Sequence, residues 1–456
     1  MLANTLYLPE LREMLRDHDE IGLREFCTAL HPARTADYMQ GLDAAEAWQV
    51  LQHADSALRK EIFGYLDEDL KVAIIEGENR EQIAELIAES APDDRVDILE
   101  EIEPEIVNQL MQLLPQEERR DILRLSSYPE GTAGAIMTTE LARLSEHLSV
   151  GDALQVLARQ SEELETIYYL YVVDNENHLR GVVSARQLVS NLGKPDTRIS
   201  ELMESDIVVV RATDDQEEVA RKVARFDLLA IPVVDDQWQL LGIITHDDVI
   251  DVVREEATED AHLIGAVEPL DDSYLETRLM TLGWKRGLWL MILFATGALT
   301  ALAMRHYHGI QEQWVWLGWF VPLIISSGGN SGSQSATLVI TAMATGDITL
   351  KDWLGVVYRE ALIGMILGGM LAVVGFFAAW LILGRVEQAV ILPITLLLVV
   401  MCGTLSGAAL PLAFRRLGLD PALMSTPFVA AIIDVVGIVI YMNMALIGAR
   451  YLFETP

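Results

Sequence analysis

The sequence predicts a multidomain protein: a superhelical α-helical domain, a duplicated α/β domain, a connecting helix and an all-α membrane domain of five transmembrane helices. Charge is segregated, because the chain has 33 Lys+Arg and 68 Asp+Glu but only 9 and 8 of them from Trp284 onward. Long uncharged runs fill that second half, and a strand–turn–strand–helix pattern occurs twice before it. The expected boundaries are 1–130 (helical domain), 131–200 and 201–264 (two copies), 265–286 (connecting helix) and 287–456 (membrane domain).

The helical domain is expected because apolar residues recur every three to four positions in short segments such as EQIAELIAES and PEIVNQLMQLL. Pro92, Pro104 and Pro115 separate these segments, as proline often does where a helix begins. The segments APDDRVDILEEI and LPQEERRDILRL are similar to successive turns of a helical repeat. We therefore expect a solenoid in which most carboxylates form a solvated acidic face.

The duplicated pattern reads TIYYLYVVDNENHLRGVVSARQLV in the first copy and LLAIPVVDDQWQLLGIITHDDVID in the second. It resembles a pair of cystathionine-β-synthase (CBS) domains. Such pairs often bind adenine nucleotides through Thr-x-x-Asp at the end of the second strand, which the second copy keeps as Thr245 and Asp248. The first copy has Ser184 and Gln187 there, and an amide accepts two ribose hydroxyls less well than a carboxylate. The resemblance thus allows ATP as a ligand, while a purely structural pair also fits.

An acidic cluster ends the second copy in ITHDDVIDVVREEATEDAHLIG. On a helix, carboxylates three or four positions apart share a face and repel one another. A solvated face usually mixes signs, so this clustering suggests a neutralising cation, and Mg²⁺ and Ca²⁺ both suit all-oxygen sites. The carboxylates are Asp247, Asp248, Asp251, Glu255, Glu256, Glu259 and Asp260. The amphipathic segment 266–286 that follows can transmit motion to the membrane or serve only as a tether.

Five long apolar runs predict five spanning helices, because about 20 apolar residues cross a bilayer. A buried core helix is the alternative for any single run, and five in series argue against it. Only Asp434 interrupts the last run. The runs are 287–304, 313–346, 361–384, 388–414 and 421–449.

The orientation follows from the positive charges that flank these runs. The N-terminal sequence is charged from its start and has no signal-peptide core, so the acidic half is expected in the cytoplasm. Six basic residues then flank the runs on the cytoplasmic side and three on the outer side, which agrees with the positive-inside rule. This places the protein in the plasma (inner) membrane with its C-terminus outside. Cys27 and Cys402 lie in different halves, as expected in a reducing compartment.

Two polar features do not fit simple membrane anchors. The run SSGGNSGSQSAT, Ser326–Thr337, lies in the middle of the second apolar run. Helix packing explains its small residues, but its polar side chains at membrane depth favour the lining of a watered path. Asp434 costs from about 2.5 kcal/mol upward near the bilayer centre, and such a carboxylate usually marks an ion path or a buried pair. Arg415 and Arg416 lie at a helix end, so a cation is the remaining explanation.

The segments PLIISSGGNSGSQSATLVITAMATGDI and LGLDPALMSTPFVAAIIDVVG, the CBS-like pair with EEATED, and the helical first domain together resemble the MgtE family of magnesium channels and transporters. The resemblance covers essentially the whole chain in the same order. It implies a homodimer in membrane lipid, with five spanning helices per subunit and a pore on the dimer axis between the second and fifth helices. The segment 265–286 matches the gating (plug) helix of the family.

The resemblance also implies site residues. Asp434 matches the pore carboxylate, with the Ala430 backbone close by, and Asn330, Gly328 and Gly329 would face the same path. The positions that match regulatory Mg²⁺ sites are Asp215, Asp227, Asp248, Asp251, Glu256, Glu259, Asp260, Asp93 and Asp97. Two positions depart from the family pattern: Thr341 replaces a common Arg, and Thr426 replaces an Asn found in some members. Both put conductance, selectivity and gating in question.

The expected function is therefore Mg²⁺-selective uptake, gated by Mg²⁺ that binds the acidic cytoplasmic domains. One alternative is transport of another divalent cation, such as Co²⁺, Mn²⁺ or Ca²⁺, although the lack of His or Cys in the path argues against soft metals. The other is a membrane receptor that senses nucleotide or metal without moving ions. The nine histidines are scattered and the two cysteines show no nucleophile or zinc spacing, so we expect no enzyme activity, and no nucleic acid partner.

Overall fold

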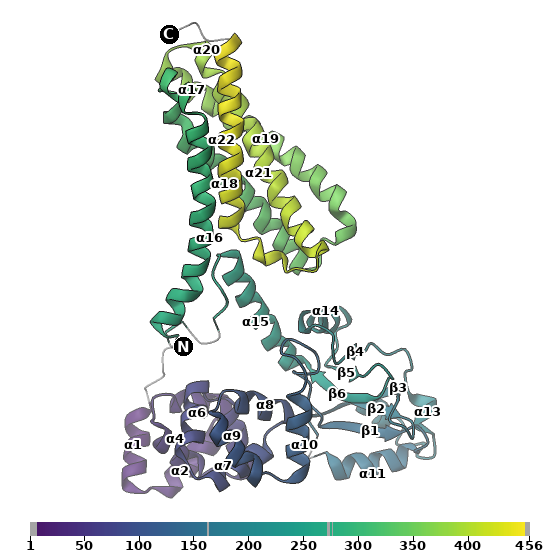
Figure 1. The fold of residues 1–456 in the computed structure, drawn as a ribbon. Helices are drawn as coiled ribbons and strands as arrows, with labels where there is room; N and C mark the ends of the chain where they lie inside the picture. The colour runs from purple at the N-terminus through teal and green to yellow at the C-terminus, as the bar shows by residue number, and fades with distance from the viewer. Residues whose placement is uncertain (1–6, 162–163, 271–273, 276, 452–456) are drawn as a thin grey trace. The chain divides into compact units, whose positions relative to one another are not determined.

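The computed structural model describes residues 7–161, 164–270, 274–275 and 277–451. The chain divides into two compact units, Met1–Val253 and Arg254–Pro456 (Figure 1). The first unit holds the helical domain and both α/β copies, and the second holds the long apolar helices.

Ten helices form the first domain of the described chain. Their bounds are α1 Leu8–Asp17, α2 Glu20–Ala29, α3 Pro32–Met39, α4 Ala44–Leu51, α5 Ser56–Gly64, α6 Glu68–Gly77, α7 Arg80–Glu89, α8 Pro92–Glu100, α9 Pro104–Leu113 and α10 Gln116–Leu125. Pro92 and Pro104 are the first residues of α8 and α9, and Pro115 is the N-cap of α10. Proline suits these positions because backbone N–H groups in the first turn of a helix have no intrahelical acceptor, so no helix hydrogen bond is lost when proline lacks one. The helix boundaries predicted from proline are confirmed.

The ten helices pack as a superhelix. Helix α3 contacts α5, α5 contacts α7 and α7 contacts α9, while α4 contacts α6 and α8 contacts α10. Apart from α1, each short helix thus packs against a helix two positions along the chain, which is the repeat packing expected of a solenoid. Trp48, Ile62 and Phe63 lie in the continuous core that results.

Each α/β copy has a three-stranded sheet of the same topology. The elements are β1 Leu141–Ser145, α11 Val150–Gln160, β2 Thr166–Val173, β3 Leu179–Ser184, α12 Ala185–Ser190, α13 Ile199–Leu202, β4 Val210–Arg211, α14 Gln216–Phe226, β5 Ala230–Val234, β6 Leu240–Thr245 and α15 His246–Ile264. Strand β1 pairs with β2 in parallel and β2 pairs with β3 antiparallel, and β4, β5 and β6 repeat this arrangement. The duplication predicted from the sequence is therefore a structural duplication.

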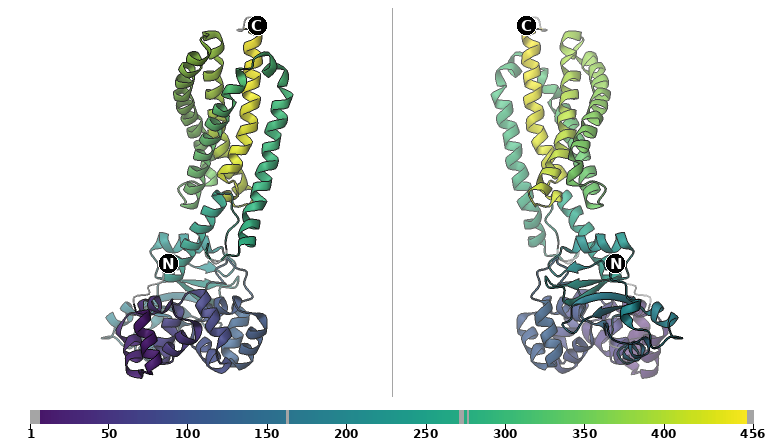
Figure 2. Two further views of the ribbon diagram at one scale, coloured as in Figure 1. Left: turned by 90° about the vertical axis from the view of Figure 1, so that its left-hand side faces the viewer. Right: turned by 90° about the vertical axis from the view of Figure 1, so that its right-hand side faces the viewer.

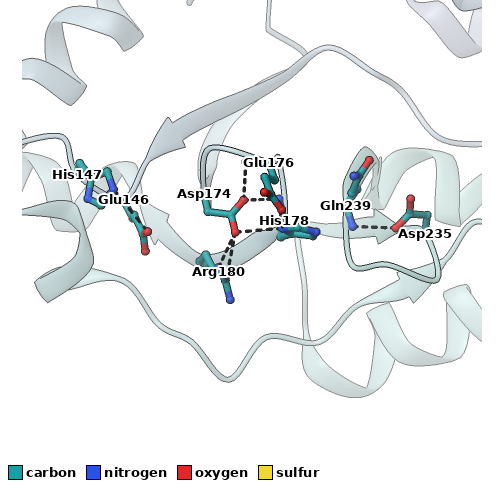
Figure 3. A network of polar contacts seen from close by, with 8 residues as sticks. All are labelled: Glu146, His147, Asp174, Glu176, His178, Arg180, Asp235 and Gln239. Atoms are coloured by element: carbon teal, nitrogen blue, oxygen red, sulfur yellow. Dashed lines mark hydrogen bonds and ion pairs between the residues drawn. The ribbon is translucent and has the colours of Figure 1, made fainter.

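The two copies meet at equivalent hairpin turns (Figure 3). The Asp174 carboxylate accepts a hydrogen bond from the His178 backbone N–H over 3.0 Å, and Asp235 accepts one from the Gln239 N–H over 2.8 Å. His178 and Gln239 form an antiparallel bridge between the copies. Each turn is held by its own aspartate, so the junction has the same local structure on both sides.

The helical domain is also tied to the α/β copies. Arg95 of α8 donates to the Ile87 carbonyl oxygen over 3.1 Å and lies 3.5 Å from the Glu140 carboxylate. Val96 and Leu125 belong to the same buried cluster as the core of the second copy. These contacts bring the N-terminal end of α8 toward the two copies.

The connecting segment differs from the continuous helix expected over 265–286. Helix α15 ends at Ile264, where Ala266 adopts a left-handed conformation with φ 58°. The Ala266 and Val267 N–H groups donate to the carbonyls of Leu263 and His262, which is the Schellman pattern of a helix C-terminus. Pro269 follows and cannot continue a helix. Within the expected range helix resumes only at Leu279, the start of α16, while 271–273 and 276 lie outside the described residues.

The second unit contains the long apolar helices, which run roughly parallel to one another in both views of Figure 2. Their bounds are α16 Leu279–His306, α17 His308–Gln313, α18 Leu317–Ala344, η1 Leu350–Asp352, α19 Trp353–Leu383, α20 Val386–Ala389, α21 Ile391–Arg416, η2 Pro421–Leu423 and α22 Thr426–Tyr451. Helix α18 contacts both α21 and α22, and α21 contacts α19. The helix with the polar run is therefore surrounded by other helices on two sides.

Four segments among the described residues are long and apolar enough to cross a membrane: Leu279–His306, Leu350–Leu383, Val386–Arg416 and Thr426–Tyr451. Helix α18 has 28 residues and no charge, but its polar run lowers its mean hydropathy, so it is not one of the four. The helical membrane domain is confirmed, and the count of five spanning helices remains a prediction.

Candidate ion pathway and regulatory carboxylates

Gly329 of α18 lies directly against the carboxylate-bearing face of α22. A Cβ atom placed on Gly329 would be 3.3 Å from the Ala430 Cβ and 3.4 Å from Asp434 Oδ1. Asp434 is half-buried, and Ser333 one turn along α18 donates its hydroxyl to the Thr426 carbonyl oxygen over 3.0 Å. The structure thus brings together three of the five predicted pore residues: Gly329, Ala430 and Asp434.

Asn330 lies in an exposed polar row on α18. Ser326, Asn330 and Gln334 are spaced by four residues and are all exposed, and the Asn330 amide donates to Ser326 Oγ over 3.3 Å. A hydrocarbon environment offers no hydrogen-bond partner to such side chains. In a membrane this row must face water or another protein surface.

Gly328 lies on a different side of α18 from the path predicted for it. It is buried, and an added Cβ would lie 2.8 Å from Ile433 Cγ2 and closer still to a Val399 methyl group of α21. A Cβ on Gly403 of α21 would lie 2.6 Å from the Gly328 carbonyl oxygen. The small residue here permits close helix packing, which is the alternative interpretation of the glycine pair Gly328 and Gly332. Because α18 is a continuous helix, its glycines do not expose a row of free carbonyl groups.

Thr426 and Thr341 are the two positions that depart from the family pattern. Thr426 is the first residue of α22 and lies beside the end of α15, and Thr341 lies near the end of α18 that leads to η1. The Thr426 hydroxyl donates to the Ile264 carbonyl oxygen, the last residue of α15, over 3.2 Å. It therefore joins the end of the acidic helix to the start of α22, eight residues before Asp434. Thr341 is exposed near the end of α18, and Arg415 of α21 donates to the neighbouring Met343 carbonyl over 3.1 Å.

A first group of regulatory candidates lies where the helical domain meets the α/β copies. Asp93 is in the first turn of α8, and its Oδ1 is buried without a hydrogen-bond partner among the described residues. Burial raises the pKa of Asp93 well above its usual value, and the nearby charges of Asp248 and Asp94 raise it further. Burial likewise raises the pKa of Asp248, although the Thr245 hydroxyl, which donates to its Oδ2, opposes the shift. The carboxylates therefore repel one another when ionised, and a cation would relieve this repulsion.

Glu165 belongs to this group although sequence reasoning missed it. It directly precedes β2 and is exposed, yet desolvation and the charge of Asp248 raise its pKa to about 7. Nothing in the pattern around Glu165 distinguishes it from a solvated carboxylate, because its neighbour Asp248 is 83 positions away. Asp97, one turn after Asp93, is exposed, and Asp251 lies one turn after Asp248 on α15.

Raised pKa values predict the pH dependence of this junction. A carboxyl group with a raised folded-state pKa contributes stability below its ordinary pKa and loses it as the pH rises through the raised value, about 7 for Glu165. Without divalent cations, the unfolding temperature of the purified chain should therefore fall as the pH rises from about 4.5, the ordinary pKa of glutamate, to about 7. The variant Glu165→Gln should flatten that decrease. A wild-type unfolding temperature that rises over this interval would contradict the prediction.

The other acidic candidates do not meet within one chain. Asp215 is the N-cap of α14, where it accepts from the Glu217 N–H over 2.8 Å, and Asp227 is the C-cap of the same helix with φ 50°. The eleven residues of α14 between them place their Cα atoms about 18 Å apart along the helix. The Asp215 carboxylate caps the helix, and at this separation the two carboxylates cannot share an ion in one subunit.

Glu256, Glu259 and Asp260 lie toward the end of α15. Burial raises the pKa of Glu259, and the carboxylates of Asp420 and Glu255 raise it further. Asp420, which precedes η2 and caps it by accepting from the Ala422 N–H, is a second residue that sequence reasoning missed. Its position in the loop before α22 places an acidic group of the membrane domain in the electrostatic field of α15.

In the part of the chain that the structure describes, no three Asp, Glu, His or Cys side chains lie close enough to hold a metal ion together. The acidic groups nevertheless match Mg²⁺, which prefers carboxylate oxygens and keeps several of its waters. One or two carboxylates and a water shell are enough for such an ion.

The two candidate nucleotide positions differ in structure. In the first copy the Gln187 side-chain oxygen accepts from the Ser184 N–H over 2.7 Å, and its NH₂ group donates to the Leu202 carbonyl over 3.5 Å. The amide is thus engaged at both ends. In the second copy Asp248 accepts from the Thr245 N–H and hydroxyl and keeps lone pairs for ribose hydroxyls.

Three family profiles match the chain. One described as a divalent cation transporter, MgtE, matches residues 321–444. The MgtE intracellular N domain matches 30–131, and the CBS domain matches 133–194 and 199–255. The profiles agree with the domain order seen in the structure.

Relatives cover the chain almost end to end. The magnesium transporter MgtE of Thermus thermophilus is 37% identical over 444 residues, which are 95% of this chain and 97% of the relative. The MgtE proteins of Enterococcus faecalis and Bacillus subtilis are 32% and 30% identical, over 97% and 95% of this chain and the same shares of their own lengths.

Two crystal structures resemble the first unit. One is the soluble part of a magnesium transporter, with a TM-score of 0.51 and 35% identity over 55% of this chain and 97% of that one. The other is the cytosolic domain of the Mg²⁺ channel MgtE in complex with ATP, with a TM-score of 0.50 and 34% identity over 53% and 98%.

Proposed function

Because the chain belongs to the MgtE family, we propose that it carries Mg²⁺ inward across the plasma (inner) membrane under the control of Mg²⁺ bound to its cytoplasmic domains. The observation that carries this proposal is the approach of Gly329 to Asp434 beside the exposed polar row of α18. A carboxylate and small polar groups at membrane depth are what a path for a hydrated cation requires.

A second copy of the chain completes the path in this proposal. The polar row Ser326, Asn330 and Gln334 is exposed in one chain and cannot face lipid. A homodimer in which two α18–α22 pairs face each other buries both rows around a shared watered axis. Two Asp434 carboxylates then lie on that axis, one from each subunit.

Hydration decides how Mg²⁺ passes such a pair. Mg²⁺ gives up its water reluctantly, so the carboxylates hold the ion through its water shell by accepting hydrogen bonds. An inside-negative potential supplies about 2.3 kcal/mol per charge for each 100 mV, which drives the ion inward without another energy source. The absence of His and Cys from the predicted path residues favours a hard cation over Co²⁺.

Closure follows from the acidic groups of the first unit and of α15. When Mg²⁺ is scarce, the carboxylates near Asp93 and Asp248 repel one another, as do those near Glu259 and Asp420. Mg²⁺ bound there removes the repulsion. The hydrogen bond from Thr426 to Ile264 then couples a movement of α15 to α22, and thereby to the path.

ATP is a second ligand in this proposal, bound at the second copy alone. Thr245 and Asp248 supply its ribose contacts, whereas the engaged Gln187 amide leaves the first copy without them. A receptor that binds nucleotide or metal without moving ions is the second candidate function. The CBS-like pair favours it, and the carboxylate at Asp434 argues against it.

Filling the space at Gly329 should block the path. Leu at this position would place a side chain against Ala430 and Asp434, so we expect Gly329→Leu to lower Mg²⁺ flux at least about tenfold by occluding the carboxylate. Gly318→Leu on the same helix is the matched control, because no described atom lies within 4 Å of a Cβ placed there. Equal flux in the two variants would exclude Gly329 from the path.

The proposed function is tested by Mg²⁺ flux into vesicles that carry the purified protein and an internal Mg²⁺-sensitive dye. We expect flux when Mg²⁺ on the side of the cytoplasmic domains is scarce, and a steep loss of flux as it reaches millimolar concentration. Mn²⁺ and Ca²⁺ added in separate assays measure selectivity. Flux that does not change with the Mg²⁺ concentration on that side would contradict the regulatory part of the proposal.

A further inference from the structure

Glu360 is a buried carboxyl group inside the membrane domain, on the side of α18 away from the proposed path. It lies in the second turn of α19 and is 8% exposed. Ser335 of α18 donates its hydroxyl to Glu360 Oε2 over 2.8 Å. No ion pair to Glu360 occurs in the described part of the chain. A buried group of this kind has a cost that hydrogen bonds must offset.

The group joins three helices. The Ser335 oxygen also lies 2.9 Å from the Thr404 carbonyl of α21, and the Thr404 hydroxyl donates to the Glu360 carbonyl over 3.1 Å. A Cβ placed on Gly407 of α21 would lie 2.9 Å from the Ser335 Cβ, so the helices are in close contact at this point. The carboxyl group, two hydroxyls and two carbonyls therefore fix α18, α19 and α21 against one another.

Ser335 is five residues beyond Asn330, which is about 140° around the helix axis. A hydrogen bond at Ser335 therefore restrains α18 on the side away from the proposed path, while Asn330 and Gln334 face the path. With a helix radius of about 5 Å, a rotation of about 20° would move the Asn330 side chain by roughly 2 Å. A shift of that size is enough to change how a water shell is held.

We propose that Glu360 is a positioning residue that sets the rotation of α18, through its hydrogen bond to Ser335, and thereby the alignment of Asn330 and Gln334 with Asp434. This inference rests on the proposed function, because it needs a path at α18. The hydrogen bond, and not the negative charge of Glu360, provides the positioning. Glutamine at this position keeps the acceptor oxygen and the shape of the side chain.

The test measures the half-saturating Mg²⁺ concentration, the maximal flux and the ratio of Mg²⁺ to Mn²⁺ flux in the full-length protein in vesicles. Glu360→Leu and the milder Ser335→Ala should raise the half-saturating concentration about tenfold and lower the flux ratio, because each removes a buried hydrogen bond. Glu360→Gln should stay near the wild type. Glu387→Leu, at an exposed glutamate of α20, is the matched control and should change nothing.

Two results would overturn the inference without touching the proposed function. In the first, the Leu and Ala variants lower only the amount of folded protein or the maximal flux, with unchanged half-saturation and flux ratio. In the second, Glu360→Gln is as impaired as Glu360→Leu, which would assign the effect to charge. Absence of flux in the wild-type protein would instead remove the proposed function and this inference together.

Discussion

Replacing Asp434 by Asn is expected to abolish Mg²⁺-dependent growth of cells that lack their own Mg²⁺ uptake. Asparagine has nearly the same shape and leaves the contact with Gly329 intact, so the variant removes the charge alone. In a dimer two carboxylates are lost. Each hydrogen bond to a charged group is worth about 1.5–3 kcal/mol, which predicts a loss of flux on the order of 10²–10⁴-fold.

The control for this variant is Asn443→Asp, an exchange of the same two residue types elsewhere on α22. Asn443 is exposed and donates to the Tyr307 hydroxyl over 2.8 Å, nine residues beyond Asp434. It lies outside the proposed path, so growth should continue. If Asp434→Asn supports growth at limiting Mg²⁺ as well as the wild type does, the carboxylate does not hold the transported ion.

Removing three regulatory carboxylates together is expected to leave the protein open when cytoplasmic Mg²⁺ is high. The variant Asp248→Ala, Asp251→Ala, Glu259→Ala removes negative charge near the start of α15 and near its end. Two of the three groups, Asp248 and Glu259, have a pKa that burial and neighbouring carboxylates raise. Ligand coupling between sites is typically worth 5–150-fold, so flux at millimolar Mg²⁺ should exceed the wild-type flux at least about fivefold. Flux at scarce Mg²⁺ should stay the same.

The matched control changes net charge equally but elsewhere. Glu13, Glu61 and Glu105 are exposed glutamates of the helical domain, and their joint replacement by Ala should leave closure intact. Normal closure of the regulatory variant would show that these carboxylates do not sense Mg²⁺. Loss of closure in the control as well would assign gating to total charge and not to specific sites.

Periodicity, proline positions and duplication predicted the order of the domains and the boundaries of the helices that proline marks, because those features act locally. The helix starts at Pro92 and Pro104 depend only on the backbone of proline. The connecting helix could not be predicted correctly from amphipathicity. The Schellman end of α15 and Pro269 stop the helix there, and the amphipathic pattern of 265–286 does not indicate a change of backbone direction.

The candidate site was predictable where a residue type has an unusually high free-energy cost in its predicted surroundings, as a charged or polar side chain has inside a membrane. Asp434 in an apolar run and polar side chains at membrane depth are such cases, and Gly329 does lie against Asp434. Gly328 is also a glycine of the polar run, but it packs against α21. The side that each glycine faces depends on how α18 is rotated about its axis, which composition does not show. Glu165 and Asp420 were missed because their acidic neighbours are distant in sequence and meet them only in the folded chain.

The central claim is that Mg²⁺ crosses the membrane beside Asp434. The most direct measurement compares Mg²⁺ influx into dye-loaded vesicles for the wild type and Asp434→Asn, under an inside-negative potential and with scarce Mg²⁺ on the side of the cytoplasmic domains. We predict influx in the wild type that ceases in the variant. Equal influx in both would place the path elsewhere in the membrane domain, and no influx in either would favour the receptor.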